Sequence, residues 1–146
     1  LESGGRVVIQ KDSPIKSAAD LKGKTVGVLV ASTWAKLAEE HGATVKSYKA
    51  ESDAMQDLVN GQVDAVITDS IAAAYAIEQS KLPLTMTPDY LSHVQKGFPF
   101  KKGKPNLVKA VNKALADMIA DGTYAKLTVP LVGYDPAPKD PIKTQF

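Results

Sequence analysis

The feature that most constrains this sequence is a regular alternation between short runs of β-branched residues and segments with helical patterning. Strand-like runs precede predicted helices at 26–30 before 34–40, 44–48 before 52–59, and 63–68 before 71–79. Strands that alternate with helices pair in parallel, because each helix returns the chain to the same edge of the sheet. We therefore predict an α/β fold in which a mostly parallel sheet is flanked by helices.

Local signals place further elements around this core. Residues 6–10 predict a short buried strand that precedes the alternating region. Ser17 and Asp20 have the spacing of a capping box, which predicts one helical turn through Leu21. Residues 82–87 predict another strand, at an edge of the sheet because Pro83 has no N–H group to donate.

The C-terminal part of the chain is dominated by one predicted helix, residues 106–120, with a broad apolar stripe. The stripe consists of Leu107, Val108, Val111, Leu115, Met118 and Ile119. We expect the α/β unit to occupy residues 1–104 and a C-terminal helical segment to occupy 105–129. Residues 130–146 contain four prolines and predict an extended tail.

Composition excludes several classes of function. The net charge of +2 is small and the lysines are scattered, so we expect no nucleic-acid partner. No run approaches the roughly 18 apolar residues that a membrane helix needs. The absence of cysteine excludes disulfides and thiol chemistry. His41 and His93 lack ligand spacing, so we expect no metal site, and nothing indicates a cofactor.

Polar side chains follow two of the predicted parallel strands, and ligands bind beyond the carboxyl ends of such strands. Ala31, Ser32 and Thr33 follow the first strand and Asp69 follows the third. Hydroxyl and N–H donors beside a carboxylate suit a zwitterion, with its carboxylate on the donors and its ammonium on Asp69. The alternative is that Ser32, Thr33 and Asp69 only cap the helices that follow them.

Signals for an enzyme are weak. The sequence has no nucleophile elbow, no glycine-rich phosphate loop and no nucleophile with an evident histidine partner. Glu39, Glu40 and Glu51 are predicted to be surface residues. Trp34 and Tyr75 either flank a ligand or pack on a helix face.

Several motifs, in this order and spacing, resemble the bacterial solute-binding proteins that serve polar amino-acid uptake by ABC transporters. They are Lys11-Asp12-Ser13, Ala19-Asp20-Leu21-Lys22-Gly23-Lys24, Val26-Gly27-Val28, Ser32-Thr33, Leu58-Val59-Asn60-Gly61-Gln62-Val63-Asp64-Ala65-Val66, Thr68-Asp69, Asn106-Leu107, Val111-Asn112-Lys113-Ala114-Leu115 and Asp121-Gly122-Thr123-Tyr124.

The resemblance implies one lobe of a type II periplasmic-binding-protein fold. In that family two α/β lobes close over an amino acid, and the second lobe offers a Gly-Ser/Thr-Thr turn and an aspartate. By the resemblance these roles fall on Ser32 and Thr33 for the ligand carboxylate and on Asp69 for its ammonium. Ala31 departs from the family pattern, which has glycine there, and its methyl group alters the turn or loosens the contact.

Nothing in the sequence matches the family's first lobe. By the resemblance, residues 1–104 are the second lobe with its hinge strands, and residues 105–129 are the segment that normally packs on lobe one. Burying each side chain of the apolar stripe is worth about 1.5–3 kcal/mol, so we expect the 106–120 helix to be covered. The candidates are this lobe, a second copy of the chain, or a separate N-terminal lobe.

We therefore predict a periplasmic protein, here as an incomplete fragment, that binds a free amino acid for delivery to an ABC transporter permease. Two alternatives stay open. One is a cyclohexadienyl dehydratase-like enzyme on the same scaffold, which would need a catalytic acid in the cleft. The other is the sensor domain of a membrane receptor.

Overall fold

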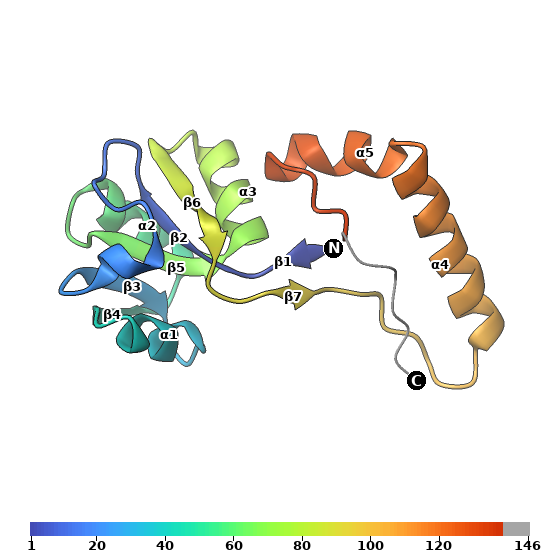
Figure 1. The fold of residues 1–146 in the computed structure, drawn as a ribbon, viewed down its shortest axis with the longest axis horizontal. Coiled ribbons are helices and arrows are strands. Elements are labelled where there is room, and N and C mark those ends of the chain that lie inside the picture. The colour runs from blue at the N-terminus through green and yellow to red at the C-terminus, as the bar shows by residue number, and fades with distance from the viewer. Residues whose placement is uncertain (139–146) are drawn as a thin grey trace. The chain divides into compact units, whose positions relative to one another are not determined.

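A computed structural model describes residues 1–138, which separate into two compact units (Figure 1). The sheet unit is Gly4–His93. The C-terminal unit consists of Leu1–Ser3 and the described residues from 94 onward. The expected division at residue 104, between the second lobe with its hinge strands and the helical segment, stays a prediction.

The sheet unit is built on five strands in the order β4-β3-β5-β2-β6. Their bounds are β2 Gly5–Gln10, β3 Thr25–Leu29, β4 Thr44–Tyr48, β5 Ala65–Asp69 and β6 Leu84–Tyr90. β3 is parallel to both of its neighbours, whereas β2 is antiparallel to β5 and to β6. Four strands thus share one direction and β2 alone opposes them. β2 lies between β5 and β6, and it is separated from β3, the next strand along the chain, by β5.

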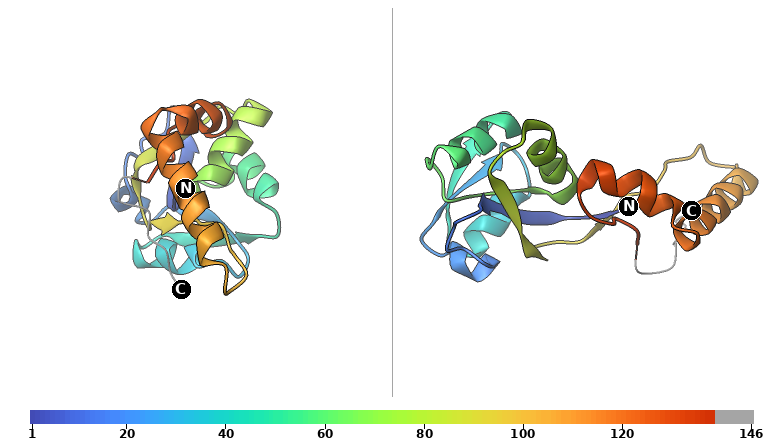
Figure 2. Two further views of the ribbon diagram at one scale, coloured as in Figure 1. Left: turned by 90° about the vertical axis from the view of Figure 1, so that its right-hand side faces the viewer. Right: turned by 90° about the horizontal axis from the view of Figure 1, so that it is seen from above.

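Helices cover both faces of this sheet (Figures 1 and 2). The 3-10 helix η1 (Ala18–Leu21) and α1 (Trp34–Glu40) bury Leu21 and Ala38 in the core on one face. α2 (Glu51–Val59) and α3 (Ser70–Ser80) bury side chains in the core on the other face. Val7 and Val8 of β2 point into opposite cores, because successive strand residues alternate between faces. The predicted α/β architecture with flanking helices is confirmed.

The C-terminal unit begins with a small antiparallel pair, β1 (Glu2–Ser3) with β7 (Val94–Gln95). It continues with α4 (Pro105–Ala120) and α5 (Thr123–Val132). α4 matches the predicted 106–120 helix, and it buries none of its residues within the described structure.

α5 continues through Pro130, where an extended tail was predicted. The proline lies in the last turn, so its missing N–H group removes only one helical hydrogen bond. The helix ends at Gly133, whose φ of 73° is left-handed and whose N–H group donates to the Val129 carbonyl at 2.8 Å. Residues 139–146 of the predicted tail lie outside the described residues.

Candidate functional site

Three helices begin at one edge of the sheet, because each follows the carboxyl end of a strand that runs in the same direction (Figure 1). α1 follows β3, α2 follows β4 and α3 follows β5. The first N–H groups of each helix have no partner inside the helix, and the helix dipoles add positive potential there. This edge can therefore hold an anionic group through backbone donors.

The turn between β3 and α1 is held by its own backbone and by Ser32. The Ser32 hydroxyl donates to the Leu29 carbonyl at 2.6 Å, and the Ser32 N–H group donates to the same oxygen at 3.2 Å. Thr33 is the N-cap residue of α1, but its side chain makes no capping hydrogen bond. Capping therefore does not account for either hydroxyl. Ser32 shapes the turn, and Thr33 is exposed at the start of the helix.

Ala31 occupies the left-handed region, with φ at 58°. A residue with a Cβ is strained in this conformation by about 1–2 kcal/mol, and glycine is the residue that adopts it freely. The family pattern has glycine at this position, and the left-handed φ explains why glycine is favoured there. Ala31 is exposed.

Trp34 packs against the core on the α1 face of the sheet. Its ring lies over Gly5 of β2, where a Cβ atom would be 2.5 Å from Cζ3 of the tryptophan. The packing role weighed for Trp34 is therefore present in the structure. A role in flanking a ligand stays a prediction.

Asp69 ends β5 and is the N-cap residue of α3. Its Oδ1 atom accepts hydrogen bonds from the N–H groups of Ile71 at 3.0 Å and Ala72 at 3.4 Å. The capping role is therefore present. It uses one carboxylate oxygen and holds the charged group at the edge where α1 and α2 also begin.

Glu51 is a residue of this edge that the sequence did not reveal. The prediction that it is a surface residue is wrong: it is partly buried, and its Oε1 atom is buried without a hydrogen-bond partner in the described structure. The Thr68 side chain is close enough to the same carboxyl group to favour its ionised form. Burial raises the pKa of Glu51, the Asp69 charge raises it further, and the Thr68 side chain opposes both effects.

A positional signal for Glu51 existed in the sequence. It follows the predicted strand 44–48 just as Ser32 and Asp69 follow theirs, so the same strand-end rule applies to it. Its placement at the start of α2, in the charged segment 51–53, favoured the surface interpretation.

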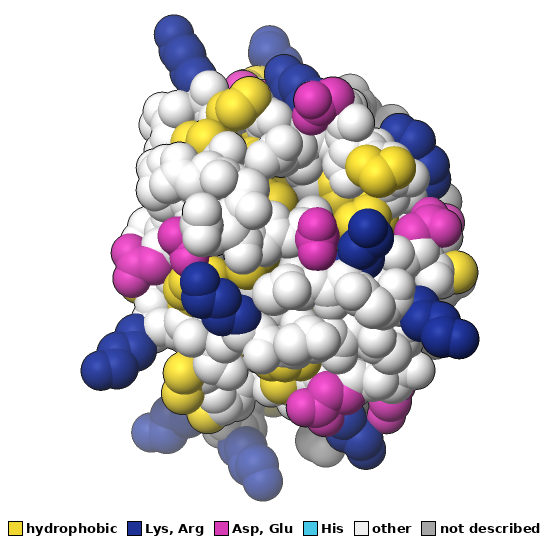
Figure 3. All heavy atoms as spheres, turned by 90° about the vertical axis from the view of Figure 1, so that its left-hand side faces the viewer, with side chains coloured by type: hydrophobic (Ala, Val, Ile, Leu, Met, Phe, Trp, Pro, Cys, Tyr) yellow, Lys and Arg dark blue, Asp and Glu magenta, His cyan; other side chains and the backbone are white. Residues whose placement is uncertain are grey.

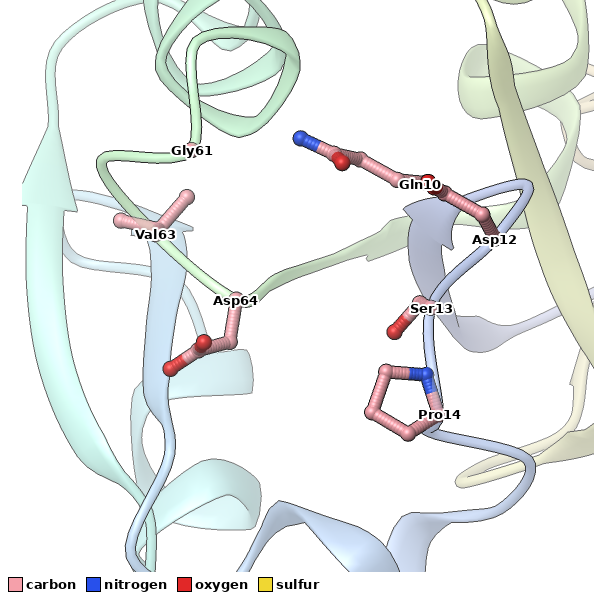
Figure 4. Close-up of a pocket in the computed structure, with 7 residues that line it drawn as sticks. All are labelled: Gln10, Asp12, Ser13, Pro14, Gly61, Val63 and Asp64. Carbon is pink, nitrogen blue, oxygen red and sulfur yellow. The ribbon is translucent and has the colours of Figure 1, made fainter.

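A hollow lies at the opposite edge of the sheet, where β5 begins and β2 ends (Figure 4). It has a volume of about 290 Å³ and is lined by Gln10, Asp12, Ser13, Pro14, Gly61, Val63 and Asp64. Two of these side chains already hold the fold together. The Gln10 amide donates to the Leu58 carbonyl at 2.6 Å, and Asp64 accepts from the Thr25 N–H group at 2.8 Å.

Charge is mixed on the face shown in Figure 3, where basic and acidic side chains are interspersed without a patch of one sign. Among residues 1–138, no group of three or more histidine, cysteine or acidic residues is placed to hold a metal ion. Within the same residues, no helix is both long enough and apolar enough to cross a membrane.

A sequence profile of the bacterial extracellular solute-binding proteins, family 3, matches residues 6–130. The chain belongs to this family. The predicted resemblance is thereby confirmed. The family is a class of extracytoplasmic proteins.

Two curated relatives and one solved structure show the extent of the likeness to other solute-binding proteins. The L-cystine-binding protein TcyJ of Escherichia coli K12 is 34% identical over 137 residues, covering 91% of this chain and 52% of TcyJ. The histidine-binding periplasmic protein of Salmonella typhimurium LT2 is 34% identical over 146 residues, covering 89% of this chain and 55% of that protein. The unliganded open L-cystine solute receptor of Neisseria gonorrhoeae matches with a TM-score of 0.85 at 24% identity, covering 94% of this chain and 60% of the receptor.

These matches confirm the predicted type II fold class of the chain. They also show that the chain spans about half the length of the curated relatives it matches. The relatives are named as binding proteins rather than as enzymes.

Proposed function

We propose that this chain supplies the second-lobe half of a periplasmic binding site for a free amino acid, which the whole protein delivers to an ABC transporter permease. The observation that carries the proposal is that the donor-rich start of α1 and the Asp69 carboxylate lie at one edge of the same sheet. A free amino acid carries one anionic and one cationic group, and this edge has a counterpart for each.

In this proposal the ligand carboxylate accepts hydrogen bonds from the Thr33 hydroxyl and from N–H groups in the first turn of α1. Ser32 holds the turn in shape through its bond to Leu29. Ala31 sets the left-handed step that aims the turn, and Trp34 borders the ligand from the helix. Asp69 accepts from the ligand ammonium while its Oδ1 atom remains the cap of α3.

The mechanism proposed is closure of two lobes around the ligand, without chemistry on it. The alternative of a cyclohexadienyl dehydratase-like enzyme gains one supporting observation, because Glu51 places a partly buried carboxyl group with a raised pKa at this edge. Incubation of the longest gene product that contains this chain with prephenate or arogenate separates the two. Turnover would establish the enzyme, and binding without turnover supports the binding protein.

We also propose that the apolar stripe of α4 packs against another lobe. Leu107 is 51% exposed and α4 buries none of its residues within the described structure. The relatives are about twice as long as this chain, which leaves room for such a lobe in the whole protein. Size-exclusion chromatography with light scattering tests whether the exposed apolar stripe of α4 requires a packing partner. We expect the 146-residue chain to self-associate, and a stable monomer with an ordered α4 would contradict this.

Calorimetry against a panel of L-amino acids tests the ligand class, using the longest gene product that contains this chain. Asp69→Asn keeps an oxygen that caps α3 but removes the charge, so the fold is preserved. Loss of a charge-assisted pair costs about 2–5 kcal/mol, so we expect the dissociation constant to rise at least about 30-fold.

Asp89→Asn is the matched control, because Asp89 is an exposed carboxylate on β6. Binding by Asp69→Asn that equals the wild type would remove Asp69 from the site. Full affinity in the 146-residue chain alone would show that the proposed second half of the cleft is not needed.

A further inference from the structure

Asn60 and Gly61 form the sole Asn-Gly pair in the sequence, since Asn106 precedes leucine and Asn112 precedes lysine. Asparagine is chemically labile, most of all before glycine, which has no side chain to shield its nitrogen. In the reaction the Gly61 nitrogen bonds to Cγ of Asn60, and the side-chain nitrogen leaves as ammonia with the Gly61 proton. Water then opens the resulting succinimide ring at either carbonyl, which yields aspartate or isoaspartate.

The pair lies in the turn that leads from α2 toward β5, and both residues are exposed (Figure 4). Asn60 is the C-cap residue of α2, with φ of −80° and ψ of −1°, and Gly61 has a left-handed φ of 72°. At this ψ the Gly61 nitrogen eclipses the backbone nitrogen of Asn60, whereas ring closure requires it to eclipse Cβ. Water can therefore reach the pair, but the folded turn cannot form the ring.

Two backbone hydrogen bonds hold the turn in this conformation. The Gly61 N–H group donates to the Leu58 carbonyl at 3.1 Å, and the Gln62 N–H group donates to the Asp57 carbonyl at 2.8 Å. Together they make a Schellman motif, the helix end that a left-handed glycine closes. Rotation about ψ of Asn60 moves both donors, so both bonds must break before the ring can form.

A side chain from the sheet holds the acceptor side of the Schellman motif. Gln10, the last residue of β2, donates through Nε2 to the Leu58 carbonyl at 2.6 Å and to the Val59 carbonyl at 3.3 Å. The Leu58 side chain is fully buried, which anchors the same turn in the core. Without the Gln10 contacts, the last turn of α2 loses its polar link to the sheet and opens more often.

We propose that Asn60 is a deamidation site that the Schellman motif and Gln10 keep closed, so that conversion proceeds through local opening of the last turn of α2. Isoaspartate adds one carbon to the main chain, so the motif cannot re-form after conversion. Either product also adds a negative charge at the C-terminal end of α2, which the helix dipole disfavours. Isoaspartate at Asn60 therefore leaves the turn open.

Peptide mapping by mass spectrometry measures the conversion, after incubation of the longest gene product that contains this chain in mildly alkaline buffer. Asn60 should convert at least about tenfold faster in urea than in the native protein, because several hydrogen bonds must open first in the native state. Asn106 and Asn112 are internal references and should convert far more slowly than Asn60 in urea. Equal rates at Asn60 in the native and unfolded protein would overturn the protection.

Gln10→Met tests the link to the sheet, because it keeps the length of the side chain and removes both donated bonds. Asn60 should then convert about two- to tenfold faster in the native protein, the change that corresponds to one or two hydrogen bonds. Hydrogen exchange of the Gly61 N–H group should rise by the same factor, since both rates follow the open fraction. Gln79→Met is the matched control, because Gln79 is exposed on α3.

Buried amides of β5 separate local opening from a general loss of stability. Val66 and Ile67 should exchange at the wild-type rate in Gln10→Met if only the turn opens. A rise there equal to that at Gly61, or an unchanged rate at Asn60, would overturn the role of Gln10. Asn60→Gln lengthens the side chain beyond the five-membered ring, so the mass change of this peptide should disappear. Its persistence would place the reaction at another residue.

Discussion

The indole ring of Trp34 lies against the backbone of Gly5, and a Cβ atom at Gly5 would be 2.5 Å from Cζ3 and 2.9 Å from Cε3 of that ring. This contact joins the start of α1 to the start of β2, so it helps to fix the turn that precedes α1. Trp34 is itself packed against the core, which limits how far the ring can move. Gly5 is therefore a position where close approach, rather than backbone freedom, requires glycine.

We expect Gly5→Ala to destabilise the sheet unit by about 1–3 kcal/mol, the usual cost of forcing extra volume into a packed site. Urea unfolding followed by tryptophan fluorescence measures it, since the sole tryptophan is the residue displaced. Gly97→Ala is the control, because no atom lies within 4 Å of a Cβ atom there. Equal midpoints for Gly5→Ala and wild type would show that Trp34 moves aside at no cost.

Ala31 provides a test of backbone strain, because its φ of 58° is unfavourable for any residue with a Cβ. Ala31→Gly removes about 1–2 kcal/mol of strain but adds an entropic cost of about 0.5–1 kcal/mol, so a net stabilisation of up to about 1.5 kcal/mol is expected. Ala31→Val, with a β-branched side chain, should destabilise instead. Thermal unfolding of the pair measures the difference, and a Val variant as stable as the Gly variant would show that the turn does not hold this conformation in solution.

Ser32 and Thr33 should separate stability from binding. Ser32→Ala loses the hydrogen bond to Leu29 and should cost about 0.5–1.5 kcal/mol of stability. Thr33→Ala loses no capping bond, so its stability should stay within about 0.5 kcal/mol of wild type while amino-acid affinity falls. Denaturant unfolding and calorimetry on the same two variants test this. If Ser32→Ala lowered the affinity and Thr33→Ala lowered the stability instead, the roles given to the two hydroxyls would have to be exchanged.

Much of the fold could be predicted because the governing signals are local. The runs at 26–30 and 63–68 contain β-branched residues that suit a strand buried on both faces, and the structure places β3 and β5 there. The direction of β2 could not be predicted, since it depends on which neighbours the strand finds after folding. The end of α5 was also missed, because Pro130 is a strong local stop signal and the left-handed cap at Gly133 acts only when the helix reaches it.

The candidate site was partly predictable for a similar reason. The strand-end rule located Ser32, Thr33 and Asp69 from sequence order alone. It did not show that Ser32 bonds back to Leu29, which depends on the left-handed step at Ala31. The rule also applies to Glu51, which follows the strand 44–48, but it does not show that the Oε1 atom of Glu51 is buried, since that depends on how α2 packs.

Asp57 of α2 links the edge strand β4 to the rest of the sheet unit and gives a pH-dependent test of its stability. Its Oδ2 atom accepts from the Lys46 ammonium at 2.8 Å and from the Tyr48 hydroxyl at 2.7 Å. The Lys46 bond first, and the Tyr48 bond second, lower the pKa of Asp57 below its usual value of 3.8. A lowered pKa in the folded state means that the stabilisation is present above the unfolded-state value and is lost as the pH falls through the folded-state value.

We therefore expect Asp57→Asn to have a lower Tm than wild type at pH 7, with the difference closing as the pH falls below about 4. Differential scanning calorimetry between pH 2 and 7 measures it, with the exposed Asp89→Asn as control. The difference should also shrink in 1 M salt, since the Debye length there is about 3 Å and the Lys46 pair is open to solvent. A difference that is the same at pH 2.5 and pH 7 would contradict the charge account, because the protonated acid is then as neutral as the amide.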